Sequence, residues 1–473
     1  MLRPYVWNPW ETATAVPDRP AVIVGSDVCT FGELTSRADA LGRGLAAAGI
    51  TGPAVLATDL PTGPRLFATV LAALRYGYGL LLLDRGYIDV ATADELRAST
   101  GASVLITDSS GSSRRSSTIV DDDLVAVRTA SAAFDFARIP AGRLIFTSSG
   151  TTGAPTALAG TLPRLPFRGV AVEQKYGAGL SWGPHLMTNP AFHLGTLGPA
   201  LYALQAGSTV VVQQHWSAEL FAALVDLHAV DTTMLSPDRL VDLIERRVAP
   251  KRALSVVFHG GDICTIGVKR AAMSLLGPVL HEYYGTSRGT LTEITTAEWL
   301  ANPGSVGKPL PGVNIRIMRR GSEVPAGQMG EIWVRPRAFR DVAGVEEYLR
   351  TGDAGYLDEK GYLFVLGRVS DTADLQHAVL EHRIRALPLV TDVALLPSDP
   401  PVCYVETGQM EQRPELTRAI RAVARRAGLA EPRVVVAEAG SLIRTMSGKL
   451  RRSALSHAGP DVDEAGEFPS LPG

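Results

Sequence analysis

The chain of 473 residues is long enough for more than one domain, because single domains typically hold about 100 to 150 residues. Hydrophobic residues make up 46% of it and charged residues 20%, as in an ordinary globular protein. The formal net charge of −2 argues against nucleic acid or an anionic membrane as the main partner.

The three cysteines, Cys29, Cys264 and Cys403, are far apart and odd in number. That spacing excludes a disulfide framework and a zinc-type ligand set, and it favours a reducing compartment. Residues Met1–Tyr5 lack the apolar core of a signal peptide. The most hydrophobic stretch, Leu66–Leu83, is too mixed in composition to span a bilayer. We therefore expect a cytoplasmic protein with no membrane partner.

The apolar pattern predicts helices alternating with strands. Apolar residues at three- and four-residue spacing predict a helix over 33–48. Strands are expected at Ala102–Thr107 and Ser208–Gln213, and helices at Ala218–Leu227 and Asp238–Arg247. This alternation favours an α/β fold with at least partly parallel sheets.

A polar connection over 108–117 precedes the most informative run of the chain, residues 145–156. There an apolar stretch leads into a turn rich in hydroxyl groups, in which Gly150 and Gly153 let the backbone bend and approach a ligand closely. Backbone N–H groups and hydroxyls of this kind form a concavity suited to phosphates. The lysine and the glycine spacing of the common nucleotide-hydrolase loop are absent. Composition alone would also fit a surface loop.

The composition of the sequence changes beyond Arg368, because Arg368–Thr407 contains none of the 47 glycines of the chain. A helix is predicted over 414–427, with arginines on its outer side. That side is either a solvated helix face or a docking surface for an acidic carrier protein.

We predict three parts from these changes. A large N-terminal domain spans 1–368. A hinge near Ser370 or Asp371 leads to a small mobile C-terminal domain over 369–456. A disordered tail, 457–473, follows.

The run over 145–156 resembles the phosphate-binding signature of the adenylate-forming (AMP-binding) superfamily of acyl-CoA synthetases, aryl acid ligases, peptide-synthetase adenylation domains and luciferases. Further segments resemble motifs of this family in the family's order, from about residue 17 to 455. They are Phe31–Leu34, Pro190–His193, Gly260–Asp262, Tyr283–Ser287, Gly304–Pro309, Tyr348–Asp353, Gly367 with Arg368, and Arg444–Lys449. One such motif would be weak, but the ordered series is specific.

The resemblance implies an α/β fold, with a large N-terminal domain of layered α/β sheets plus a small C-terminal α+β domain joined by a hinge. It implies an ATP-dependent, AMP-forming ligase that activates a small carboxylic acid as its acyl-adenylate and releases pyrophosphate. ATP and Mg²⁺ would be the cofactors, and the acyl group would pass to a thiol of CoA or of an acyl carrier protein, in specialised metabolism.

The same resemblance assigns roles to residues. Lys449, the closing lysine of the family, would bridge the carboxylate and the α-phosphate as the small domain closes, and His193 would lie near the adenylate. Both reactants are anions, so the site must screen their repulsion. The remaining ATP-binding candidates are Thr147, Ser148, Ser149, Gly150, Thr151, Thr152 and Gly153 for phosphates, Gly260, Gly261, Tyr284, Gly285 and Thr286 for adenine, Ser287 for the α-phosphate, and Asp353 and Arg368 for the ribose.

Four of these residues also have an interpretation that involves no ligand. Asp353 is also suited to capping its own turn, and Arg368 to the surface. Tyr284 fits a half-buried strand position, and His193 a satisfied core histidine. The ordered motifs favour the functional interpretation of Asp353, Arg368 and Tyr284, whereas the two interpretations of His193 are balanced.

Three departures from the family pattern make this chain atypical. Arg288 stands where the family has its magnesium-binding glutamate, so Thr152 (through the phosphates) and Glu293 are the metal candidates. Thr156 replaces a lysine that often ends the phosphate loop. The glycine-containing segment that usually follows the hinge is absent, which bears on the acceptor.

Other functions compete with this assignment. Gly285–Gly289 fits the G-x-S-x-G pattern of serine hydrolases around Ser287, with Asp353 and His377 following in hydrolase order. The β-branched residues after Ser287 disfavour the helix which that motif needs. The adenylate could also be handed to an amine or another nitrogen nucleophile, or the chain could be a degenerate nucleotide-binding relative.

The acid pocket is expected to be lined by four segments, whose small residues, together with Trp182 and His185, suggest a compact acid. They are Trp182–Phe192, Thr232–Pro237, His259–Gly261 and Tyr284–Thr286.

Overall fold

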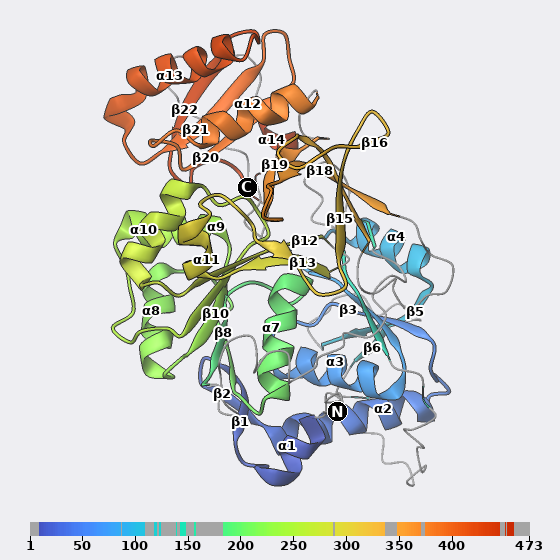
Figure 1. Ribbon diagram of the computed structural model, residues 1–473. Coiled ribbons are helices and arrows are strands. Elements are labelled where there is room, and N and C mark those ends of the chain that lie inside the picture. The colour runs from blue at the N-terminus through green and yellow to red at the C-terminus, as the bar shows by residue number, and fades with distance from the viewer. Residues whose placement is uncertain are drawn as a thin grey trace. The chain divides into compact units, whose positions relative to one another are not determined.

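The computed structural model describes most of the chain (Figure 1). The described residues are 9–86, 88–108, 118–120, 123, 139, 142–147, 156–157, 183–286, 289–335, 348–369, 374–444, 450 and 452–457. Contacts divide the chain into two compact units: 1–150 with 154–234 and 250–255, and 151–153 with 235–249 and 256–473. No described helix combines the length and the apolar character needed to cross a membrane.

The first unit contains a five-stranded parallel sheet in the order β6-β5-β3-β4-β7. Its strands are β3 (Val55–Thr58), β4 (Gly79–Leu82), β5 (Ala102–Thr107), β6 (Thr118–Val120) and β7 (Arg143–Ile145). Every residue of β4 is buried, as expected for a central parallel strand. The helices α3 (Pro64–Tyr76) and α4 (Val90–Thr100) connect successive strands.

A second sheet of the first unit has the order β10-β8-β9-β1-β2, in which only β2 runs antiparallel to its neighbour. Its strands are β1 (Pro20–Val24), β2 (Asp27–Thr30), β8 (His185–Met187), β9 (Val210–Val212) and β10 (Thr232–Leu235). The accompanying helices are α1 (Pro9–Ala15), α2 (Phe31–Ala47), α7 (Leu194–Gln205) and α8 (Ala218–Leu227). A capping box of Thr30 and Glu33 begins α2.

The second unit begins with the strand order β11-β12-β13-β14. These strands are β11 (Val256–His259), β12 (Leu280–Thr286), β13 (Gly289–Ile294) and β14 (Lys308–Pro309), with helices α9 (Pro237–Arg246), α10 (Ile266–Leu276) and α11 (Thr296–Ala301). The first pair is parallel, and the others are antiparallel. The carboxyl end of β11 leads directly into Gly260 and Gly261, so the sheet fixes where this glycine pair lies.

An antiparallel sheet of the same unit, in the order β16-β15-β17-β18-β19, carries the Asp353 motif. Its strands are β15 (Asn314–Arg319), β16 (Ser322–Glu323), β17 (Gly330–Arg335), β18 (Leu349–Leu357) and β19 (Leu363–Arg368). The register of β18 and β19 pairs Asp353 with Arg368 across the strands.

Residues from Leu375 onward build a sheet with its own core on both faces. The elements are α12 (Leu375–Arg385), β20 (Asp392–Leu396), β21 (Val402–Thr407), η2 (Met410–Gln412), α13 (Arg413–Arg426), β22 (Arg433–Glu438) and α14 (Arg452–His457). The helices α12 and α13 lie near the β20-β21-β22 sheet (Figure 1). Their side chains pack on one face of this sheet, and Leu442, Leu450 and Leu455 pack on the other. A self-contained core of this kind supports the predicted small α+β domain.

The expected strand and helix at 102–107 and 218–227 match β5 and α8 end to end. The helices expected at 33–48, 238–247 and 414–427 are present and each shifted by one or two residues, and the strand expected at 208–213 is the shorter β9. Most of the 108–117 connection, the hinge at Ser370 and Asp371, and all but the first residue of the tail lie outside the described residues. The domain boundary at 368 stays a prediction.

A buried ion pair joins α10 to β12 in the second unit. The Nζ atom of Lys269 on α10 is 2.6 Å from Oε2 of Glu282 on β12, with side chains 1% and 8% exposed. The indole ring of Trp299 lies beneath the ammonium, 4.8 Å from it. Burial raises the pKa of Glu282, and Lys269 opposes that rise. Neither charge is in water, so each depends on the other.

We predict that Lys269→Met lowers the free energy of unfolding by roughly 3–5 kcal/mol, because it leaves the carboxylate of Glu282 buried without its cation. Denaturant unfolding measures this. The double variant Lys269→Met/Glu282→Gln should recover part of the loss. The control is Arg246→Met, because Arg246 makes an ion pair of similar length, 2.7 Å, with Asp242 while its side chain is 56% exposed. If both single variants lose equally little stability, the buried pair does not hold this region.

Candidate functional site

The carboxylate of Asp353 is the best-defined element of the predicted site. It is 10% exposed, and each of its oxygens faces a different strand. The hydroxyl of Tyr284 on β12 donates to Oδ2 at 2.6 Å, and Nε of Arg368 on β19 lies 3.4 Å from Oδ1. Three predicted ATP-binding residues from separate motifs therefore meet at one carboxylate.

The turn before Asp353 is fixed by its own residues. Gly352 has φ +79°, a conformation that favours glycine. The hydroxyl of Thr351 accepts the N–H of Asp353 at 3.0 Å and donates to the carbonyl of Ile332 at 2.8 Å. The sequence motif contained Thr351, but its role became visible only from this pair of hydrogen bonds.

Tyr284 combines the two interpretations that its sequence allowed. It is a half-buried strand residue, and its hydroxyl is part of the Asp353 cluster. Burial and the neighbouring Asp353 hold the pKa of Tyr284 well above its ordinary value. The phenol is therefore a neutral donor at physiological pH. Because carboxylate oxygens have further lone pairs, Asp353 keeps capacity to accept from a ligand.

The Gly260–Gly261 pair lies at the end of β11, where space is restricted on one side. A Cβ atom at Gly260 would be 2.5 Å from the carbonyl oxygen of Tyr283, so no other residue fits without displacement of β12. Gly261 has φ +90°, is exposed and has no neighbour within 4 Å of a hypothetical Cβ. The exposed backbone at this turn leaves room for a flat ligand, as the adenine assignment requires.

The segment around Gly285 is a tight hairpin. A Cβ at Gly285 would be 2.7 Å from the carbonyl oxygen of Gly289, and Thr286 pairs with Gly289 across the two strands. Ser287 and Arg288 join these strands and lie outside the described residues.

The serine hydrolase alternative loses its structural basis here. Its motif requires a helix after the serine, whereas the element that follows is the strand β13. Its proposed histidine, His377, lies 2.9 Å from Asp374, whereas Asp353 contacts Tyr284 and Arg368.

Only the ends of the predicted phosphate loop are described. Thr147 follows β7 and pairs with Ala157 through an isolated antiparallel bridge, which closes the intervening segment at its base. Thr147 is 3% exposed, and its hydroxyl has no hydrogen-bond partner among the described residues. A buried hydroxyl without a partner is suited to a ligand contact. Thr156 is exposed. The candidates Ser148, Ser149, Gly150, Thr151, Thr152 and Gly153 lie outside the described residues.

His193 lies in the first unit, at the N-cap position of α7. It is half-buried, its ring is 4.3 Å from that of Phe192, and its side chain makes no capping hydrogen bond. The structure does not decide between the two interpretations given for it, so its role near an adenylate stays a prediction.

The metal candidate Glu293 is half-buried on β13, opposite Tyr283. Glu293 is four residue steps along the strand from Gly289, a distance of about 13 Å. That separation makes Glu293 a poor substitute for a glutamate at position 288. Within the described residues, no three His, Cys, Asp or Glu side chains are grouped as metal ligands.

Lys449 and the four residues before it lie outside the described residues, and the residues on either side are described. Arg444 and Leu450 pair through an isolated antiparallel bridge, as Thr147 and Ala157 do at the phosphate loop. In both segments predicted to contact ATP phosphates, a described residue before the segment therefore pairs with a described residue after it.

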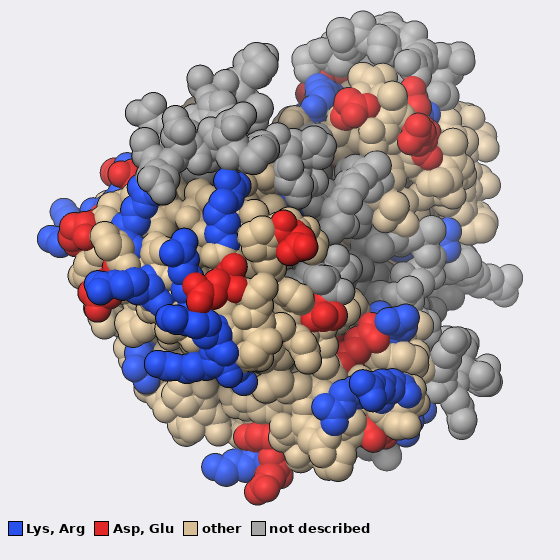
Figure 2. Space-filling view, turned by 90° about the horizontal axis from the view of Figure 1, so that it is seen from above, with Lys and Arg blue, Asp and Glu red and all other residues tan. Residues whose placement is uncertain are grey.

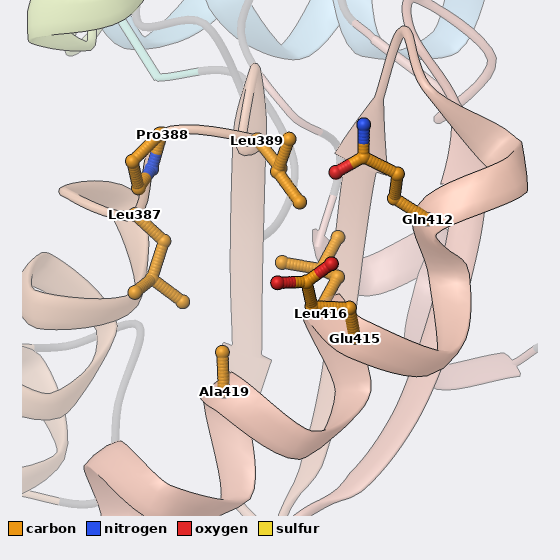
Figure 3. A pocket seen from close by; sticks show the side chains of 7 residues that line it. All are labelled: Leu387, Pro388, Leu389, Gln412, Glu415, Leu416 and Ala419. Atoms are coloured by element: carbon orange, nitrogen blue, oxygen red, sulfur yellow. The ribbon is translucent and has the colours of Figure 1, made fainter.

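A groove of about 280 Å³ lies on the small domain, away from these motifs in sequence. It lies between the loop after α12 and the start of α13 (Figure 3). Its lining residues are Leu387, Pro388, Leu389, Gln412, Glu415, Leu416 and Ala419. None of them was a predicted site residue.

Comparison with known proteins agrees with the motif series. The sequence profile described as "AMP-binding enzyme" matches residues 9–339. The 2-succinylbenzoate–CoA ligase of Bacillus subtilis (strain 168) is 26% identical over 379 residues, which cover 76% of this chain and 77% of that protein. The fatty acid–[acyl-carrier-protein] ligase ScoC of Streptomyces coeruleorubidus is 27% identical over 250 residues, 47% of each chain.

Solved structures match nearly the whole chain. The o-succinylbenzoate CoA synthetase of Bacillus subtilis, in complex with its acyl-adenylate intermediate, has a TM-score of 0.77 at 23% identity, covering 96% of this chain and 99% of that one. A structure of the synthetase with ATP and a magnesium ion has a TM-score of 0.75 at 22% identity, covering 94% and 98%. At this identity the likeness shows a shared fold, and it confirms the predicted α/β architecture.

Proposed function

The chain belongs to the family of AMP-binding enzymes, and from that premise we propose that it activates a small carboxylic acid as an acyl-adenylate and passes the acyl group to an acceptor. Family membership confirms the predicted AMP-forming ligase class. The acid, the acceptor and the roles of individual residues are proposals that rest on the chain's own groups.

The Asp353 cluster is the observation that carries this proposal. A short carboxylate is held between a neutral phenol and an exposed arginine, and carboxylate oxygens are suited to accept hydrogen bonds from the two hydroxyls of a ribose. Arg368, 46% exposed, would face the phosphate side of the nucleotide. The Gly260–Gly261 turn admits a flat base, and the buried hydroxyl of Thr147 begins the phosphate loop. These residues fit ATP.

Magnesium would neutralise phosphate charge as ATP binds, and a structure of the Bacillus synthetase holds ATP with a magnesium ion. In this chain Arg288 occupies the position of the family's metal-binding glutamate, and a cation does not ligate a cation. We propose that phosphate oxygens hold the ion, and that Arg288 takes over part of the screening of charge.

A general test is acid-dependent release of pyrophosphate from ATP across a panel of small aromatic and aliphatic acids, with mass spectrometry of the adenylate. We expect a compact acid to stimulate release. Nucleotide binding without any acid-dependent release would favour a degenerate nucleotide-binding relative.

We predict that Lys449→Ala lowers the rate of adenylate formation by roughly 10²–10³-fold and leaves ATP affinity close to that of the wild type, because the ammonium acts mainly on charge that develops in the transition state. Pyrophosphate release and ATP titration measure the two quantities. Near-normal release from the variant would refute the assignment of Lys449.

The Arg288 proposal predicts a change in metal dependence. Arg288→Glu supplies the carboxylate that relatives have, so the variant should need more magnesium for half-maximal rate and keep some activity. A magnesium titration of both proteins measures this. If the wild type already shows the ordinary dependence and the variant is inactive, another group holds the metal.

Features beyond the hinge point to an acceptor other than free CoA. The segment from Asp371 to Leu380 has no glycine, and so no backbone that could lie close to a narrow thiol arm. Asp371 and Asp374 would repel CoA phosphates unless they are paired, and the structure pairs Asp374, which is 55% exposed, with the ring of His377 at 2.9 Å. Hydrogen bonds from the backbone and ring of His377 lower the pKa of Asp374.

The small domain offers basic side chains to a protein partner. Arg418, Arg421 and Arg425 are exposed on α13, which also lines the groove described above. Figure 2, viewed from above, shows basic side chains gathered over part of the surface. We propose that an acidic carrier protein, with an amine as the alternative acceptor, is preferred over free CoA.

This proposal predicts slow and non-saturating formation of acyl-CoA when enzyme, ATP and a turned-over acid are mixed with CoA. Mass spectrometry of the thioester measures it, and the same reaction with a carrier protein bearing its pantetheine arm is the comparison. Efficient, saturable acyl-CoA formation would place the enzyme among ordinary CoA ligases.

A further inference from the structure

Two carboxylates face each other on the small-domain sheet. Asp392 on β20 and Glu406 on β21 are directly opposite in the antiparallel register. Their side chains are only 15% and 1% exposed. Like charges in opposite positions on adjacent strands destabilise a sheet. This arrangement therefore needs a cation between them.

Arg444 provides that cation. Its Nη1 lies 2.9 Å from Oδ2 of Asp392, and its Nη2 lies 2.6 Å from Oε2 of Glu406, with the arginine side chain 13% exposed. The second oxygen of Glu406 accepts the N–H of Leu442 at 2.7 Å. Burial acts to lower the pKa of Arg444, but Asp392 and Glu406 outweigh it and raise the pKa. The guanidinium is thus permanently charged and held by two strands at once.

The chain is also anchored after position 449. Leu450 pairs with Arg444 through the isolated bridge and is buried in the same apolar cluster as Leu442 and Leu455. Two residues further on, Nη2 of Arg452 donates to Oε1 of Glu381 at 2.8 Å, and that carboxylate is 1% exposed. Buried ion pairs thus secure the backbone on both sides of residues 445–449.

We propose that Arg444 is a positioning residue for Lys449: the Asp392–Arg444–Glu406 bridge anchors the chain five residues before the lysine, as buried Leu450 does directly after it. The inference rests on the proposed role of Lys449 in adenylate formation. Lysine is a point charge on a flexible stem, so its ammonium is placed only as well as its backbone is. A displacement of about 1 Å at a reacting group can cost roughly 10²-fold in rate.

The planar fork of Arg444 is the specific requirement. It donates to two carboxylates from two strands, which a single ammonium cannot reproduce with the same geometry. Arg444→Lys keeps the charge and loses the fork, whereas Arg444→Met loses both. Arg383, which is exposed on α12 of the same domain, gives the matched control Arg383→Met.

The first measurement is acid-dependent pyrophosphate release under saturating and varied ATP. We expect kcat to fall by about 10- to 100-fold in both Arg444 variants, with a KM for ATP within about threefold of the wild type, since the lysine acts on the transition state. Arg383→Met should behave as the wild type does. A merely structural loss would instead lower the amount of active enzyme and leave the rate per active site unchanged.

The second measurement reads the position of Lys449 without any activity. The chain has six lysines: Lys175, Lys251, Lys269, Lys308, Lys360 and Lys449. Brief acetylation followed by peptide mass spectrometry gives the reactivity of each. We expect Lys449 to change severalfold in Arg444→Met relative to the exposed Lys251 and Lys360. The buried Lys269 reports unfolding, because it reacts only if its pair with Glu282 opens.

These readouts separate the possible failures. If Lys449→Ala keeps normal pyrophosphate release, the proposed role of Lys449 is wrong, and the acetylation result still decides whether Arg444 fixes that lysine. If Arg444→Met is folded, with Lys269 protected, and both kcat and Lys449 reactivity equal those of the wild type, the inference is overturned. Should Arg444→Met expose Lys269, Arg444→Lys and Glu406→Gln take its place under the same criteria.

Discussion

The carboxylate of Asp353 is the interaction on which the proposed site depends. It joins β12 to β18 and β19, since Tyr284 donates to one oxygen and Arg368 lies beside the other. The phenol stays neutral because burial and Asp353 itself hold its pKa high. A donor that cannot ionise at physiological pH and a cation that is always charged therefore keep this carboxylate oriented. In the same unit, the glycine turn after β11 and the hairpin at Gly285 are shaped by close backbone contacts that larger residues would disrupt.

The two segments that are predicted to contact the phosphates of ATP are flanked by described residues that pair in the same way. Each leaves a well-packed strand region, and each is closed by a single antiparallel bridge, at Thr147 with Ala157 and at Arg444 with Leu450. A reacting group contributes to rate only when it is held in the correct position. In the small domain the anchor is an ion-pair bridge between two facing carboxylates, and removing its arginine would leave both carboxylates without a cation. If Arg444 positions Lys449 as proposed, stability and catalysis depend on the same buried charges.

Much of the fold follows from local sequence pattern. Periodicity located α2, α8 and α13 to within one or two residues, because their apolar faces and caps are encoded locally. Ordered motifs predicted Tyr284, Asp353 and Arg368 as site residues, and the structure brings these three side chains together. The motifs could not predict which of these side chains contact each other. The hydrogen bond from Tyr284 to Asp353 joins residues 69 positions apart, and the ion pair of Arg444 with Asp392 joins residues 52 positions apart. Such contacts depend on strand register, which the sequence specifies only through the packed sheet.

The central claim is that this enzyme forms an acyl-adenylate reversibly at the site built around Asp353. Acid-dependent exchange of labelled pyrophosphate into ATP tests it most directly, because exchange reports the first half-reaction and needs no acceptor. The account predicts exchange with a compact acid in the wild type, and in Asp353→Asn a KM for ATP raised by roughly tenfold or more, since a hydrogen bond to a charged group contributes about 1.5–3 kcal/mol. Exchange that needs no acid, or an unchanged KM for ATP in the variant, would contradict it.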